Sequence, residues 1–96
     1  MAITTALIER GKDGTFGVFT PDINHTIIGD GNTVEEAKAD FENSVQEMIL
    51  SYTETGRELP DELKDIRFVY KYDIASMFDI ESTLHALGNE LAAIKL

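Results

Sequence analysis

The chain has 96 residues, which is enough for one compact domain with a short appendage. Its 18 acidic side chains outnumber 8 basic ones and give a formal charge of −10, so nucleic acid is a doubtful partner, because such binding relies on cations that displace phosphate counterions. No cysteine is present, and this excludes disulfides and zinc sites built on thiolates.

Three short strands are predicted ahead of a long helix, over residues 2–10, 15–20 and 26–29. The first is rich in Ile, Thr and Leu, and the turn Gly11-Lys12-Asp13-Gly14 leads from it into the second. Phe16 and Phe19 should lie on opposite faces of the second strand, and Gly17 between them indicates a bulge or a close packing contact. Strands joined by such short connections are most simply an antiparallel meander.

A long amphipathic helix is predicted to begin after Thr33 and to run to about Thr55, with Gly56 as its stop. Thr33 and Glu36 form a capping box, in which the hydroxyl accepts from the Glu36 amide and the carboxylate accepts from the Thr33 amide. Apolar residues then recur at spacings of three and four, which predicts one buried stripe. The stripe consists of Val34, Ala37, Phe41, Val45, Met48, Ile49 and Tyr52.

The opposite face of this helix is acidic and has Lys38 as its only base. One interpretation is a solvated surface that keeps the protein soluble. The other is a binding surface for a basic partner protein. Under that interpretation the partner-binding candidates are Glu35, Asp40, Glu42 and Glu47.

A fourth strand is predicted over residues 66–72, because IRFVYKY alternates strictly. One face carries Ile66, Phe68, Tyr70 and Tyr72, and the other carries Arg67, Val69 and Lys71. A right-handed crossover through the helix should deliver this strand to the edge beside strand one and parallel to it. The expected fold is therefore α+β, with connectivity β-β-β-α-β, strand order 3-2-1-4 and the helix on one face.

Residues 73–96 are expected to form a helical tail behind a domain of residues 1–72. Its apolar residues repeat at spacings of four and three, and Gly88 is either a weak point in one helix or the turn between two. The repeating residues are Ile80, Leu84, Leu87, Leu91 and Ile94. Such a stripe packs either on its own domain or against a second copy, and we expect a homodimer.

No catalytic constellation is evident, so no enzymatic activity, cofactor or metal is expected. His25 and His85 have no cysteine or serine partner in a recognisable arrangement. Asp22 and Asp30 lie in predicted loops, where aspartate usually bonds its own backbone. The enzymatic alternative is a degenerate nuclease that holds magnesium with these two carboxylates.

No targeting or membrane segment is evident either. The start MAITTALIERG has no basic region followed by a long apolar run, as a signal peptide would. No segment approaches the roughly 20 apolar residues of a membrane span. We therefore expect a soluble, cytoplasmic protein.

A series of short motifs over residues 3–72 resembles the HicB-type antitoxin family. The motifs are an aromatic turn at Gly14 and Phe16, a step at Pro21 and Asp22, and the helix start at Gly31, Thr33, Glu36 and Ala37. The resemblance implies a partial RNase H-like fold without catalytic carboxylates. It also implies a protein that binds and neutralises a small HicA-type toxin, an mRNA-cleaving protein whose basic surface would suit an acidic partner.

Two features depart from the family pattern. Asn24 and His25 stand where members often have Pro-Gly, so this loop should be shaped differently. Many members end in a DNA-binding module, whereas here residues 84–89 would be followed by a recognition helix nearly free of base-reading side chains. The alternatives to a toxin-binding antitoxin are thus an orphan homo-oligomer, or a transcriptional autorepressor with a truncated helix-turn-helix tail.

Overall fold

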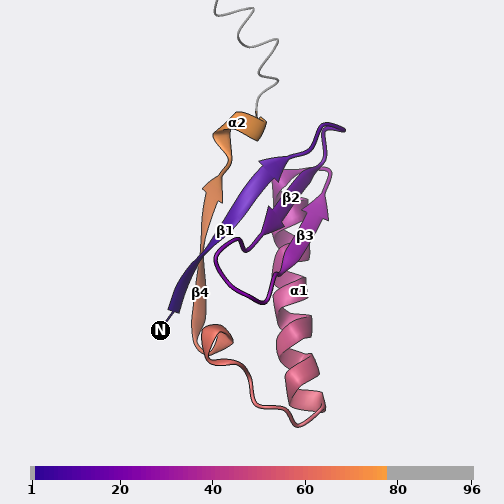
Figure 1. The fold of residues 1–96 in the computed structure, drawn as a ribbon. Helices are drawn as coiled ribbons and strands as arrows, with labels where there is room; N and C mark the ends of the chain where they lie inside the picture. Colours follow the sequence, from indigo (N-terminus) through magenta and orange to yellow (C-terminus); the bar gives the residue numbers. More distant parts are fainter. Residues whose placement is uncertain (1, 78–96) are drawn as a thin grey trace, which may run out of the picture.

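The computed structural model describes residues 2–77, which form one four-stranded sheet with a long helix on one face (Figure 1). The strands are β1 (Ala2–Arg10), β2 (Phe16–Phe19), β3 (Ile28–Gly31) and β4 (Ile66–Tyr72). The helices are α1 (Val34–Glu54), the short 3-10 helix η1 (Asp61–Leu63) and α2 (Ile74–Met77). Residue 1 and residues 78–96 lie outside the described part, as do most of the predicted tail and its dimer contact.

The predicted topology is confirmed. The sheet has the order β3-β2-β1-β4, with β1 antiparallel to β2 and parallel to β4. The parallel pairing runs from Ala2 opposite Ile66 to Ile8 opposite Tyr72. The long helix α1 provides the crossover that carries the chain from one edge of the sheet to the other.

Helix α1 begins and ends as predicted, with one difference in its cap. Thr33 is extended and its hydroxyl accepts a hydrogen bond of 3.1 Å from the Glu36 amide. The Glu36 carboxylate, however, accepts from the amide of Asn32 at 2.8 Å and not from that of Thr33. The reciprocal half of the capping box thus reaches one residue further back. At the other end Gly56 has φ of +67°, as a helix stop requires.

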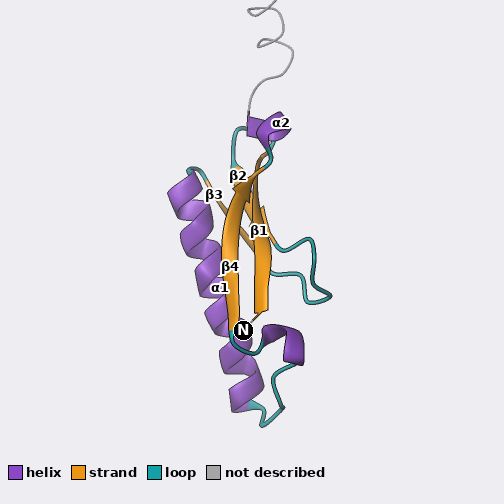
Figure 2. Ribbon diagram, turned by 90° about the vertical axis from the view of Figure 1, so that its left-hand side faces the viewer, coloured by secondary structure: helices purple, strands orange, loops and turns teal. Residues whose placement is uncertain are grey.

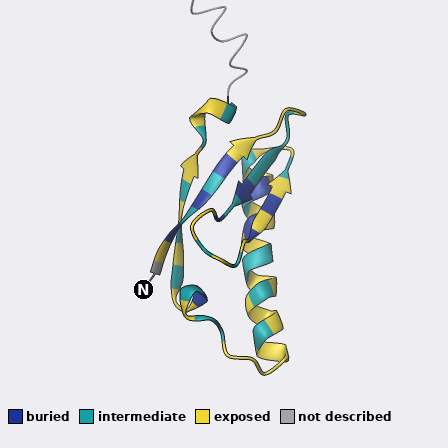
Figure 3. Cartoon of the chain, viewed as in Figure 1, coloured by how far each residue is buried: buried dark blue, intermediate teal, exposed yellow. Residues whose placement is uncertain are grey.

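The core lies between α1 and the inner face of the sheet. Phe41 is fully buried at its centre, and its ring meets that of Phe68 edge-on at a centroid distance of 5.0 Å. The other buried apolar residues are Ala6, Ile8, Val18, Ile27, Ala37 and Leu63, drawn dark blue in Figure 3. Ile49, assigned to the buried stripe above, is 37% exposed. It lies about 80° around the helix from Phe41, at the margin of the buried arc.

Strand β3 lies two residues later than predicted, over Ile28–Gly31, and the reason is its contact with α1. A Cβ atom placed on Gly29 would lie 2.2 Å from the backbone nitrogen of Phe41, and one on Gly31 would lie 2.6 Å from Cβ of Glu36. These glycines let strand and helix backbones touch. The bulge or close contact predicted at Gly17 is wrong, because its pairing is continuous and a Cβ there would meet nothing closer than 3.9 Å.

Candidate functional site

Two surfaces of the described chain are candidates for binding: the solvent-facing side of α1 and the sheet face turned away from α1. We call the second surface the open face. Figure 2 shows α1 on one side of the sheet, and a loop and η1 on the other. Each surface is built below from the residues that form it.

Helix α1 is strongly acidic on its solvent side. It contains six acidic residues and one basic residue, a formal charge of −5, and all six acidic residues are exposed. They are Glu35, Glu36, Asp40, Glu42, Glu47 and Glu54. No basic residue stands in the last turn, where it would complement the helix dipole. The negative charge therefore extends over the whole length of the helix, about 31 Å.

The only base of α1 is turned toward β4. Lys38 Nζ lies 4.4 Å from the ring centroid of Tyr70, a cation–π contact, and the Tyr70 hydroxyl donates a 2.8 Å hydrogen bond to Glu42. Burial raises the pKa of Tyr70, and the Glu42 carboxylate raises it further, so the hydroxyl remains a donor. The arrangement fixes Glu42 beside β4.

The four predicted partner-binding residues form two rows and not one cluster. Glu35 and Glu42, seven positions apart, lie on the β4 side, where Glu42 bonds Tyr70. Asp40 and Glu47, also seven apart, lie on the β3 side, where Asp40 accepts a 2.9 Å bond from the Asp30 amide. Glu47 accepts a 3.2 Å bond from Asn43 on the same helix. Glu35 has no hydrogen-bond or ion-pair partner within residues 2–77.

Between the two acidic rows runs an uncharged crest that the sequence interpretation did not separate from them. Four exposed residues form it: Ala39, Asn43, Gln46 and Leu50. The side chain of Leu50 is 55% exposed, although it is large and apolar. The helical period alone gives this arrangement, since the four residues recur at spacings of three and four.

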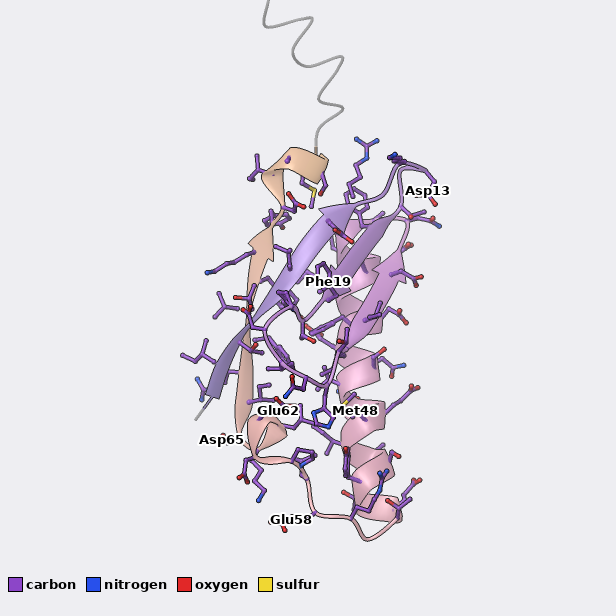
Figure 4. All side chains as sticks on the ribbon, viewed as in Figure 1. Asp13, Phe19, Met48, Glu58, Glu62 and Asp65 are labelled. Carbon is purple, nitrogen blue, oxygen red and sulfur yellow. The ribbon has the colours of Figure 1, made fainter. Side chains whose placement is uncertain are left out.

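The open face carries an apolar surface. Strand register aligns Ile28, Phe19, Leu7 and Lys71 in one row across all four strands. Ile28 is 62% exposed, and nearby on β1 and β4 Ile3 and Val69 are 66% and 44% exposed. Figure 4 labels Phe19 within this row. The alternation of residues 66–72 had predicted which side chains share a face of β4. The pairing register of all four strands is needed to bring these residues onto one surface.

A loop of residues 20–27 and η1 cover the remaining part of the open face. Glu62 on η1, labelled in Figure 4, accepts hydrogen bonds from Nδ1 of His25 and, at 3.3 Å, from the amide of Asn24. The bond from His25 lowers the pKa of Glu62, and the Asn24 amide contributes in the same direction. These contacts hold the loop against η1.

A cavity of about 310 Å³ lies between this loop, η1 and the sheet. Its walls are apolar at Ile3, Ile23 and Val69, while Asp22, Glu62 and Lys71 supply charge. Two carboxylates in so small a space disfavour a phosphate-bearing ligand. Within the part of the chain that the structure describes, no three His, Asp or Glu side chains gather to hold a metal ion. Asp22 and Asp30, the two carboxylates of the nuclease alternative, therefore belong to no such group of three within residues 2–77.

The motif residues occupy separate places on the domain. Gly14 has φ of +86° in the β1–β2 turn, Phe16 packs against the core, and Pro21 is exposed beside Asp22. The remaining motif residues, Gly31, Thr33, Glu36 and Ala37, form the junction of β3 with α1. Most of these residues build the fold, and among them only Asp22 lines the cavity.

No helix within residues 2–77 combines the length and the apolar character that crossing a membrane requires. Comparisons of the chain with family models, with curated proteins and with solved structures gave no match.

Proposed function

We propose that this chain is a non-catalytic, cytoplasmic antitoxin that binds and neutralises a small basic toxin of the HicA type. The observation that carries the proposal is the pair of acidic rows along α1, all exposed, with the only base of the helix turned onto Tyr70. The resemblance of residues 3–72 to HicB-type antitoxins supports the same function.

The geometry of α1 suits a partner with a groove that has basic walls. The crest would enter the groove with Leu50 and Gln46, and each acidic row would face one wall. Asp40 and Glu42 each accept one hydrogen bond within the domain, and a carboxylate has further lone pairs for a basic side chain. The internal bonds also hold both carboxylates in place before binding, which lowers the entropic cost of association.

A toxin that handles RNA exposes basic groups to phosphates. An acidic protein that covers those groups competes directly with RNA and associates rapidly through electrostatic steering. No reaction is required of the antitoxin. Inhibition then depends on covering the surface of the toxin.

The test is co-expression with a HicA-type toxin, followed by co-purification and a growth assay. Glu35→Lys combined with Glu47→Lys reverses one charge in each row without disturbing the bonds of Asp40 and Glu42. We expect this double variant to lower the association rate at least tenfold at low salt. The loss should shrink above about 0.15 M salt, where the Debye length is roughly 8 Å.

Glu9→Lys is the matched control, because Glu9 is exposed on β1 and remote from α1. It should leave toxin binding and growth rescue unchanged. The proposal fails if the wild-type protein neither binds the toxin nor restores growth. The assignment to α1 fails if Glu9→Lys weakens binding as much as the double variant does.

A further inference from the structure

The open face is an uncovered apolar surface in the described part of the chain. Ile3, Ile28 and Val69 are each more than two-fifths exposed, and Leu7 and Phe19 lie between them in register. The inner face of the same sheet packs against α1 around Phe41. A second layer on the open face would complete the burial that a sheet of this composition favours.

Two bases accompany this apolar surface. Arg67 and Lys71 are exposed on β4 and project to the same side as Val69. Neither has an ion-pair partner within residues 2–77. They are the bases that β4 offers to an acidic occupant, and Lys71 shares its cavity with the carboxylates of Asp22 and Glu62.

The chain leaves the described domain at the carboxyl ends of β1 and β4. The amide of Asp73 donates to the Ile8 carbonyl at 2.8 Å, and the Arg10 amide donates to Oγ of Ser76 at 3.0 Å. Met77, the last described residue, packs against the core cluster. These contacts anchor α2 at the carboxyl ends of β1 and β4 (Figure 1), and α2 begins three residues after Lys71.

The sequence that follows is complementary to the open face. Residues 78–96 carry the apolar stripe of Ile80, Leu84, Leu87, Leu91 and Ile94. The same segment contains three acidic residues, Asp79, Glu81 and Glu90, against the single base Lys95. A helix over residues 80–94 would be about 22 Å long, close to the roughly 23 Å of the seven-residue strand β4.

We propose that residues 78–96 fold back onto the open face of their own domain. The stripe covers Leu7, Phe19 and Val69, and the acidic residues lie near Arg67 and Lys71. A tail anchored at Met77 has an effective concentration on the order of millimolar at this surface. That exceeds the micromolar concentration of a second copy, so the intramolecular arrangement prevails over a dimer through the tail.

The absence of cysteine from the full chain gives a direct test. Val69→Cys combined with Leu87→Cys places one thiol on the open face and one in the stripe. We expect a short bis-maleimide to join them within one molecule at micromolar protein, at a yield that dilution does not change. Gln46→Cys with Leu87→Cys is the matched control, because Gln46 lies on the exposed crest of α1. Its yield should be at least tenfold lower.

Two results would overturn the proposal. Cross-linking between molecules would assign the open face to the tail of a second copy, and equal yields for the two cysteine pairs would show that the tail has no fixed site. A second variant removes the dependence on cross-linking. Leu84→Asp with Leu91→Asp should shift the methyl NMR signals of Ile3 and Val69 and leave the signal of Val45, on the core side of α1, unchanged. Unmoved signals of Ile3 and Val69 would contradict the assignment. Toxin binding through α1 is measured separately, so either proposal can fail alone.

Discussion

Replacing Gly29 by alanine tests the contact between β3 and α1 most directly. The added Cβ would lie 2.2 Å from the Phe41 nitrogen, 2.5 Å from the Phe41 Cα and 2.7 Å from the Ala37 carbonyl oxygen. All three are backbone atoms of α1, so no side chain can rotate away. Restoring an ordinary contact of 3.4 Å requires strand and helix to separate by about 1.2 Å.

That separation loosens the packing around Phe41, the largest fully buried side chain. Overpacking in a core costs typically 1–3 kcal/mol, and a clash between two backbones belongs at the upper end, so we expect about 3 kcal/mol. With a urea m-value on the order of 1 kcal/mol/M, the unfolding midpoint should fall by about 3 M. Circular dichroism during urea titration measures this change.

Gly17→Ala is the matched control on the neighbouring strand. A Cβ at Gly17 would meet its nearest atom at 3.9 Å, an ordinary contact, so the change in stability should stay within about 0.5 kcal/mol. Equal urea midpoints for Gly29→Ala and Gly17→Ala would show that α1 does not rest on the backbone of β3. If Gly29→Ala cannot be folded at all, Gly31→Ala, whose closest approach is 2.6 Å, provides a milder change in the same direction.

Two further substitutions test the helix cap and the loop tether. Thr33→Ala removes the bond to the Glu36 amide and should cost about 1 kcal/mol in urea unfolding, whereas Thr33→Ser should restore most of it. Glu62→Gln weakens the bond from His25. Folding lowers the pKa of Glu62 below its ordinary value of 4.5. The Glu62 carboxylate therefore stabilises the folded state fully above pH 4.5, and this stabilisation is lost as pH falls through the folded-state pKa. Wild type should therefore unfold at higher urea than Glu62→Gln at pH 7, with the difference closing below about pH 4.5. A difference that stays constant with pH, or one that Glu9→Gln reproduces, would contradict this assignment.

The fold was largely predictable because its main determinants are local. Thr33 and Gly56 mark the ends of α1, and the alternation of residues 66–72 identifies β4 without ambiguity. Chain connectivity and the handedness of crossovers then leave few orders for the strands. A prediction fails where a distant contact overrides local preference. Strand β3 takes up the pair Gly29 and Gly31, which are poor strand formers, because only glycine admits α1 so closely.

The candidate site was less predictable, for a related reason. The sequence shows that α1 has an acidic face, but the division into two rows depends on contacts with other strands. Asp40 is held by Asp30, and Glu42 by Tyr70, 28 positions away. The open face requires the register of four strands before Ile3 and Val69 can be placed together. Leu63 lies on η1 and its side chain is buried. No periodic pattern in the sequence predicted this burial, because the surrounding stretch was interpreted as a loop.

The pairing of β1 with β4 also determines how this chain acquires its structure. Strand β1 pairs with β4 from Ala2 opposite Ile66, although the two strands are far apart in the sequence. During synthesis β1 therefore leaves the ribosome long before its parallel neighbour is made. Until then one edge of β1 has unsatisfied amides and carbonyls, a template for misassociation. Closing so long a loop carries a large entropic cost and slows folding. Docking of β4 onto β1 is therefore the contact that completes the native topology.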